Sequence, residues 1–235
     1  MYLSIIVPTY NEKNILVKNI NTIYNNFKNN FEFEIIIVND GSNDGSDKIL
    51  SNLNLNNLKI KSNKINKGKG YSILKGISES KGELILFTDA DLSTPINEFN
   101  KLIEKYKKGY DFVIGSRSRH NSDVKIRQSL LRTIMGKIFN FLIKFILGLK
   151  YYDTQCGFKL FNAKKIKLIS KLCKVDRFCI DVEILFLAKK LNYNVFEEGV
   201  IWINDTSSSI NICLDSLNMF VDLIKIRFRN FKQFY

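Results

Sequence analysis

Short apolar runs rich in β-branched residues recur through the first 115 residues, each separated from the next by a stretch with helical spacing. The runs read LSIIVP, FEIIIVND, LKIKS, GELILFTDAD and YDFVIGS, and the helical stretches cover residues 12–29, 44–52, 69–80 and 96–108. Strands that alternate with helices of this length form βαβ units and a mostly parallel sheet. Runs that are apolar nearly throughout indicate strands covered on both faces. We therefore expect an α/β fold, with a Rossmann-like sheet flanked by helices.

Polar motifs follow the expected strands directly: PTYNE, NDGSNDGS, TDADLSTP and GSRSR. In open sheets of this kind, ligands bind beyond the carboxyl ends of the strands. Tyr10 and Glu12 have the chemistry to stack on a nucleobase and to hydrogen-bond to it. Asp40 can accept a hydrogen bond from a base or a ribose, although an acid at such a turn also serves as a helix N-cap. Lys67 and Lys69 lie near an expected helix start, where phosphates bind well.

Asp89 and Asp91 stand one residue apart at the end of a strand, in LFTDADLSTP. Two like charges in one place are costly unless a cation lies between them. Carboxylate oxygens suit Mg²⁺ or Mn²⁺, which keep several waters and bridge substrate phosphates. The alternative is a solvated turn. An acid suited to base binding upstream favours the metal interpretation.

The net charge of +13 indicates a polyanionic partner, which can be nucleic acid, anionic lipid or a phosphorylated substrate. The basic residues are dispersed, and no RNA-binding, zinc-finger or helix-turn-helix signature is visible. A nucleic-acid partner also leaves the acidic pair unexplained, so we expect none. The first residues do not have the pattern of a signal peptide, so we expect none, and no uninterrupted apolar run is long enough to span a membrane.

Two amphipathic helices are expected near residues 126–149 and 213–232. At helical spacing, the apolar residues of the first fill one half of its circumference, and Arg132, Lys137, Asn140 and Lys144 lie on the other half. A cationic amphipathic helix can lie in the headgroup plane of an anionic bilayer. The alternative is that both helices pack their apolar faces onto the domain. A lipid-phosphate substrate favours the first interpretation.

The motifs PTYNE, VNDGSNDGS, DADLSTP and GSR, in this order, resemble those of the inverting family 2 glycosyltransferases of GT-A fold. In the second half, DTQCGFKLF, DRFCIDVEIL, VIWIND and DSLNMFVDLIKIRFR are similar to the dolichyl-phosphate β-glucosyltransferases and their polyprenyl-phosphate relatives. The resemblance covers roughly residues 3–230. It implies a single GT-A catalytic domain over residues 1–235, with a nucleotide-sugar-binding half, 1–115, and an acceptor-binding half, 116–235.

The resemblance also implies roles for individual residues. The nucleotide sugar is expected to contact Pro8, Tyr10, Glu12, Asp40, Lys69, Asp89 and Ala90. Asp89 and Asp91 are the expected metal ligands, and Ser93 stands where several relatives carry a glutamine that also touches the metal. The acceptor is expected to contact Arg117, Arg127, Arg132, Trp202 and Ser208. The residues expected to be catalytic are Asp91, Asp153, Arg117 and Arg132.

The implied reaction is the transfer of a hexose, with inversion, from a nucleotide sugar to a dolichyl or polyprenyl phosphate, with Mg²⁺ or Mn²⁺ as cofactor. UDP-glucose is the favoured donor, and GDP-mannose is the alternative. A second alternative keeps the enzyme but changes the acceptor to a saccharide hydroxyl, for which Asp181 or Glu183 would be the general base. Both residues fit the polar face of a helix equally well. We expect a peripheral protein on the cytoplasmic side of a membrane.

Overall fold

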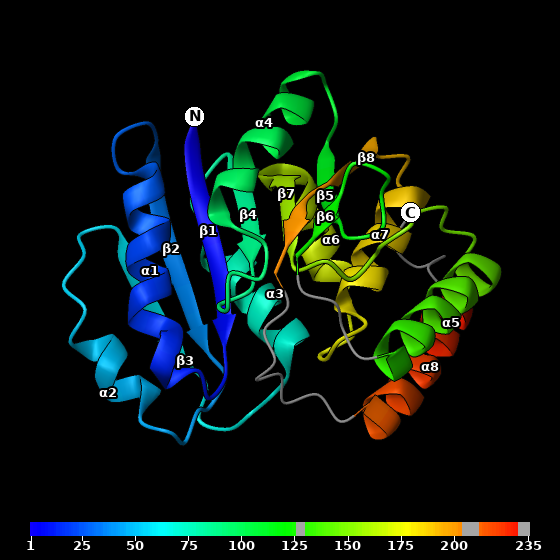
Figure 1. Ribbon diagram of the computed structural model, residues 1–235, viewed down its shortest axis with the longest axis horizontal. Helices are drawn as coiled ribbons and strands as arrows, with labels where there is room; N and C mark the ends of the chain where they lie inside the picture. The colour runs from blue at the N-terminus through cyan, green and yellow to red at the C-terminus, as the bar shows by residue number, and fades with distance from the viewer. Residues whose placement is uncertain (126–129, 204–211, 230–235) are drawn as a thin grey trace.

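The computed structural model describes residues 1–125, 130–203 and 212–229, and its centre is a seven-stranded sheet in the order β3-β2-β1-β4-β7-β5-β8 (Figure 1). The strands are β1 (Tyr2–Thr9), β2 (Glu32–Asn39), β3 (Leu58–Ser62), β4 (Leu84–Thr88), β5 (Phe112–Ser116), β7 (Phe158–Asn162) and β8 (Val195–Gly199). A separate two-stranded sheet joins β6 (Asp123–Val124) to β9 (Ile201–Trp202). The expected strands of the first half are all present.

The sheet is parallel except for β7, which lies antiparallel between β4 and β5. Residues 117–157 connect β5 to β7, which lies in the middle of the sheet. The expected Rossmann-like, mostly parallel sheet is thus confirmed, with one antiparallel strand inserted at its centre. The division of the chain into two halves at residue 115 stays a prediction.

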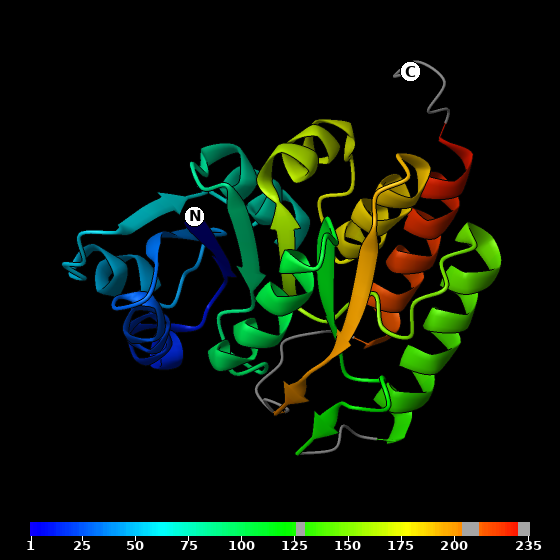
Figure 2. The same ribbon diagram turned by 90° about the horizontal axis from the view of Figure 1, so that it is seen from above.

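Helices cover both faces of this sheet (Figure 2). They are α1 (Lys13–Phe27), α2 (Ser46–Ser51), α3 (Lys69–Glu79), η1 (Ile96–Glu98), α4 (Phe99–Lys107), α5 (Leu130–Leu147), α6 (Ala163–Leu172), α7 (Ile180–Lys190) and α8 (Ile212–Phe228). Helices α1 and α4 share one buried cluster, whereas α3, α6 and α7 share another. Each of the two clusters includes side chains from β1 and β4, so both faces of the sheet are buried.

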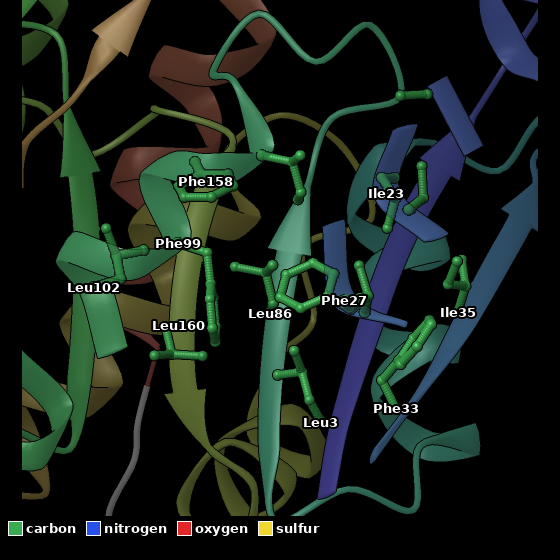
Figure 3. Packing of buried hydrophobic residues seen from close by; sticks show 14 of the residues in the cluster. Leu3, Ile23, Phe27, Phe33, Ile35, Leu86, Phe99, Leu102, Phe158 and Leu160 are labelled. Carbon is green, nitrogen blue, oxygen red and sulfur yellow. The ribbon is translucent and has the colours of Figure 1, made fainter. Parts of the chain in front are cut away.

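Alternation along the strands explains the two clusters. On β4, Leu84 and Leu86 belong to the first cluster, and Ile85 and Phe87 belong to the second. Successive side chains of a strand point to opposite faces, which is why apolar runs without polar interruptions fit here. In the first cluster Phe27 of α1 contacts Phe99 of α4 edge to face, with ring centroids 5.0 Å apart (Figure 3). This packing joins α1 and α4 over the face of the sheet to which Leu84 and Leu86 of β4 contribute.

Helices α5 and α8 lie side by side at one end of the molecule, as both views show (Figures 1 and 2). Their buried side chains form one cluster with residues of α7, and the members from these two helices are Phe139, Ile143, Leu147, Leu223 and Ile226. Other apolar side chains of α5 stay exposed, among them Phe141 at 66% and Phe145 at 81%. The packing interpretation is therefore confirmed for part of the apolar surface of these helices, whereas a contact of the exposed part with a bilayer stays a prediction. Within the described residues, no helix is both long enough and apolar enough to cross a membrane.

Candidate active site

The carboxyl ends of β1, β2 and β4 lie next to one another, because β1 pairs with both of the other strands. A hydrogen bond from the Asp40 amide to the Thr9 carbonyl, 2.9 Å, ties the first two ends together. Pro8 is buried within β1, whereas Tyr10, just past the strand, is 39% exposed. The exposed ring of Tyr10 is free of the core packing and is available to a ligand at this edge.

Asp40 is buried, and its hydrogen bonds hold the loop that precedes α3. Its carboxylate accepts hydrogen bonds from the amides of Lys67 (2.9 Å) and Gly68 (2.7 Å) and from the side chain of Asn63 (2.7 Å). Gly68 has a φ of +106°, and a Cβ there would lie 2.4 Å from the Asp176 carbonyl oxygen, so only glycine fits. Asp40 does not cap the helix that follows it, since Gly45 holds the N-cap position of α2. A contact of Asp40 with a nucleotide stays a prediction.

Asp89 and Asp91 come directly after β4, where the sequence predicts a metal site. The Lys69 ammonium at the start of α3 lies 2.7 Å from Asp89 Oδ1. Ser93 donates to Asp91 twice, from its amide to Oδ1 and from its hydroxyl to Oδ2, both at 2.8 Å. Ser93 therefore orients Asp91. Ala90 between the two acids is buried, and its carbonyl accepts a hydrogen bond of 2.8 Å from Asn19 of α1.

Negative charge is concentrated at this point. Burial, together with the neighbouring carboxylate of Asp89, raises the pKa of Asp91. Burial and the charges of Asp91 and Asp89 raise the pKa of Glu12 to about 8. Conversely, the attraction of Asp89 raises the pKa of Lys69 to about 12, against the opposing effect of burial. Three acids and one lysine thus share one electrostatic environment, in which a further positive charge would be stabilised.

The donor set fits a divalent cation such as Mg²⁺ or Mn²⁺. Asp89 and Asp91 offer hard carboxylate oxygens, and each oxygen that already accepts a hydrogen bond keeps a second lone pair. The described residues contain no group of three or more acidic, histidine or cysteine ligands around a common point. The protein would therefore supply few ligands, leaving positions for water and for phosphate oxygens, which is how Mg²⁺ is usually held.

Arg117 and Asp153 form a second charged centre, immediately after β5 and before β7. The Asp153 carboxylate accepts from Arg117 Nε at 2.6 Å, from Nη2 at 2.9 Å and from the backbone amide of Arg117 at 3.0 Å. The guanidinium charge and these hydrogen bonds outweigh burial and lower the pKa of Asp153 to about 2. The same attraction raises the pKa of Arg117. The pair is therefore ionised near neutral pH, and the catalytic roles expected for Asp153 and Arg117 stay predictions.

The two charged centres adjoin one another. Gly157 accepts a hydrogen bond from the Asp89 amide at 3.1 Å, and a Cβ on Gly157 would lie 1.8 Å from Asp89 Oδ2. The loop 153–157, between Asp153 and β7, therefore touches the acidic pair at its far end. Asp89 also contributes to the raised pKa of Arg117, as expected for charges that are near each other.

Strand β9 and the residue after it contact both charged centres. The Arg117 guanidinium carbon lies 5.4 Å from the ring centre of Trp202, a cation–π distance. The next amide, of Ile203, donates a hydrogen bond of 2.7 Å to the carbonyl of Ser93. The structure thus brings Trp202, Arg117 and the acidic motif together, although they are distant in the sequence.

For three of the predicted acceptor-binding residues, the structure does not describe the side chain. Arg132 lies on α5, but its side chain is outside the described part of the structure. Arg127 and Ser208 lie outside the described residues altogether. Their roles stay predictions.

Two residues near the site were not singled out from the sequence. Glu197 of β8 accepts hydrogen bonds from the amides of Tyr152 (2.9 Å) and Asp153 (2.7 Å) and so holds the start of the loop. Lys159 of β7 is buried and donates to the Cys156 carbonyl near the end of the loop. A lysine inside the otherwise apolar strand FKLF was a visible signal, whereas nothing in VFEEG marked Glu197.

The candidate general bases for a saccharide acceptor have structural partners. Asp181 is 3% exposed and pairs with Lys159, Nζ to Oδ1, at 2.5 Å. Glu183 is fully buried and accepts from the amides of Lys174 (2.9 Å) and Val175 (2.8 Å). Neither carboxylate is presented to an incoming hydroxyl.

Comparison with known proteins agrees with the motifs. Residues 4–169 match the family described as Glycosyl transferase family 2. A dolichyl-phosphate beta-glucosyltransferase from Dictyostelium discoideum is 36% identical over an alignment 249 positions long. The alignment covers 97% of this chain and 75% of the relative. A protein of the same name from Homo sapiens is 30% identical over 243 residues, with coverage of 97% and 75%. The resemblance inferred from the motifs is confirmed.

A solved structure shares the fold. Glucosyl-3-phosphoglycerate synthase from Mycobacterium tuberculosis, in complex with Mn²⁺ and uridine-diphosphate-glucose, matches with a TM-score of 0.72 at 13% identity. The match covers 96% of this chain and 78% of that chain. It confirms the expected GT-A fold.

Proposed function

Because the chain belongs to glycosyl transferase family 2 and is a glycosyltransferase, we propose that it transfers glucose from UDP-glucose to dolichyl phosphate or another polyprenyl phosphate. The transfer would invert the anomeric carbon and depend on Mg²⁺ or Mn²⁺. The names of the relatives from Dictyostelium and human support the sugar and the acceptor. The Mn²⁺ and UDP-glucose in the mycobacterial neighbour support the cofactor and the donor.

One observation carries the proposal: the acidic pair Asp89 and Asp91 adjoins the Arg117–Asp153 pair through Gly157. The carboxylates suit a metal-bound diphosphate, and the guanidinium suits a phosphate monoester. A donor and an acceptor that both carry phosphate therefore find partners of suitable charge side by side. A saccharide hydroxyl has no charge for Arg117 to neutralise and would need a base, whereas Asp181 and Glu183 are engaged with other partners.

The acceptor needs no general base. The second pKa of a phosphate monoester is about 6, so its oxygen is already largely ionised near neutral pH. Arg117 would bind this phosphate with the guanidinium N–H groups that Asp153 does not use, because Asp153 takes only Nε and one hydrogen of Nη2. Asp153 would hold the guanidinium plane in a fixed orientation. Trp202, against that plane, would restrict its rotation and exclude water.

On the donor side, a bound Mg²⁺ or Mn²⁺ supplies Lewis-acid stabilisation of the charge that develops on the leaving diphosphate. Asp89 and Asp91 would hold the ion, and the two hydrogen bonds from Ser93 would keep Asp91 in place. Lys69 lies at the amino end of α3, where the helix dipole also favours an anion, and would contact the phosphates. Tyr10 would stack on the base.

The lipid acceptor requires access to a membrane surface, for which α5 and α8 are the proposed contact. Exposed apolar side chains recur along both helices, at Ile134, Ile138, Phe141 and Phe145 on α5 and at Leu217, Phe220, Val221, Ile224 and Phe228 on α8. Lys137 and Lys144 on α5 and Lys225 and Arg227 on α8 are exposed as well. Apolar and cationic side chains together suit an anionic bilayer surface. We propose a peripheral association with the cytoplasmic face.

The membrane contact is tested by cosedimentation with vesicles that contain phosphatidylserine. The variant F141S/F145S should lose most of its binding, since full burial of each phenyl ring in the interface contributes about 1.5–3 kcal/mol. The matched control is Ile65→Ser, because Ile65 is 67% exposed but lies in the loop before α3. Equal loss in both variants would count against this surface.

The function itself is tested with purified protein, Mn²⁺ or Mg²⁺, a polyprenyl phosphate and labelled UDP-glucose or GDP-mannose in parallel. The expected result is label in the organic phase from UDP-glucose only, and no transfer by Asp91→Ala. Label from GDP-mannose alone would correct the donor. Metal-dependent hydrolysis of the nucleotide sugar without transfer to lipid would refute the lipid acceptor and point to a saccharide.

A further inference from the structure

An ion pair between Lys159 of β7 and Asp181 of α7 is buried at the centre of the protein. The side chains are 1% and 4% exposed, and Nζ lies 2.5 Å from Oδ1. Burying two charges costs more desolvation free energy than an apolar pair of the same size would. Stability alone therefore does not explain why this pair stands inside an apolar sheet.

The position of Lys159 connects it to the site. In the register of β7 with β4, Lys159 lies opposite Phe87. Phe87 precedes Asp89 by two residues. The same ring lies 5.8 Å from Lys159 Nζ and 5.1 Å from Lys69 Nζ, measured to its centroid. Besides Asp181, the ammonium of Lys159 binds the carbonyl oxygen of Cys156, within the loop 153–157.

That loop carries a functional contact at each end. At its start Asp153 holds Arg117, with Nε 2.6 Å from Oδ2. At its end Gly157 touches Asp89 so closely that no side chain fits between them. The Cys156 carbonyl lies next to Gly157, so a change in its position would shift both contacts.

We propose that Lys159 and Asp181 are positioning residues, which anchor the loop 153–157 through the Cys156 carbonyl and thereby align the acceptor-binding arginine with the acidic pair. Asp181 fixes the lysine, and the lysine fixes the loop. An ammonium has three donors, so it can serve the carboxylate and the carbonyl together, which no apolar side chain can do. The effect on transfer rests on the proposed function, whereas the anchoring of the loop does not.

The test compares K159M, D181L and the double variant K159M/D181L. Each single variant leaves one charge buried without its partner and should lower the melting temperature by roughly 6–20 °C. In the double variant both charges are gone, and the melting temperature should return to within about 5 °C of the wild type. If the pair served stability alone, the double variant would behave like the wild type in every measurement.

The positioning role predicts that two properties stay impaired in the double variant. Amide hydrogen exchange in the peptide that contains Tyr152, Asp153 and Gln155 should be at least about tenfold faster than in the wild type, because the loop has lost its anchor at Cys156 and Glu197 alone holds its start. The ratio kcat/KM for polyprenyl phosphate should fall roughly 10- to 100-fold through misalignment. The Kd for UDP with Mn²⁺ should rise much less than kcat/KM falls, because the hydrogen bond from the Asp89 amide still holds Gly157 beside the acidic pair.

The control is Lys59→Met, which removes an ammonium 2.5 Å from another buried carboxylate, Glu34, near the opposite end of the parallel strands. It should lower the melting temperature and leave kcat/KM and the exchange of the loop unchanged.

Wild-type exchange in a well-folded double variant would overturn the proposal, whatever the activity. A loosened loop with normal transfer would overturn the positioning role. Should the double variant not fold, K159M gives the same exchange comparison below its own melting temperature. If the wild type transfers no sugar to lipid, the proposed function fails, and the exchange measurement still decides whether the pair anchors the loop.

Discussion

Replacing Asp153 by asparagine tests whether the contact of this residue with Arg117 is needed for stability and for transfer. The asparagine keeps the size of the side chain but carries no charge, and its amide nitrogen cannot accept a hydrogen bond. It therefore cannot reproduce the two-pronged contact with Nε at 2.6 Å and Nη2 at 2.9 Å. Arg117, whose side chain is 29% exposed, would turn partly into water.

The pKa of Asp153 gives the expected loss of stability. The pKa is about 2 in the folded protein and 3.8 without these contacts. At 1.36 kcal/mol for each pKa unit, the difference corresponds to about 2 kcal/mol of unfolding free energy at neutral pH. The melting temperature should fall by roughly 4–8 °C.

The sign of the pH dependence follows from the lowered pKa. The stabilisation by Asp153 is complete well above 3.8 and is lost as the pH falls towards about 2. The difference in stability between the wild type and Asp153→Asn should therefore be constant from about pH 6 to 8 and shrink below about pH 4.

Transfer of the sugar should be affected by a similar free energy. The loss of an orienting, charge-assisted contact of about 1.5–3 kcal/mol corresponds to a roughly 10- to 150-fold lower kcat/KM for the polyprenyl phosphate. The Kd for UDP should not change. The control is Asp123→Asn, because Asp123 also pairs with a cation, Lys125, but is 50% exposed and lies outside the site. Near-normal transfer by Asp153→Asn, with an unchanged melting temperature, would refute the reasoning.

Other substitutions test the remaining contacts. Arg117→Lys should lower kcat/KM for the lipid phosphate about tenfold and leave the Kd for UDP unchanged, because an ammonium cannot bind phosphate in two-pronged fashion; an unaltered kcat/KM would contradict this. Gly157→Ala would place a methyl group 1.8 Å from Asp89 Oδ2, so calorimetry should show at least tenfold weaker Mn²⁺-dependent binding of UDP, and wild-type affinity would disprove the close approach. In Glu12→Gln the melting temperature in EDTA should exceed that of the wild type by a margin that grows from about pH 5 to 8, because the pKa of Glu12 is raised from 4.5 to about 8 and ionising it destabilises the folded state; a constant margin would exclude this charge effect.

The local pattern of the sequence was sufficient for much of the fold and for the donor side of the site. Buried strands read as unbroken apolar runs, and in parallel units each polar motif must follow its strand to the same edge. Asp89, Asp91 and Glu12 could therefore be placed together from the chain order alone. Lys69 followed from its position at the start of a helix.

What joins the two charged centres depended on contacts between distant parts of the chain. The insertion of β7, antiparallel, between β4 and β5 puts Gly157 against Asp89, and no local pattern records which strands become neighbours. Lys159 and Glu197 were visible as residues but not as partners of the loop 153–157, because a buried charge is recognised only by what it faces. Local spacing determines which elements form and where polar motifs emerge, whereas the pairing of strands across the sheet decides which charges meet.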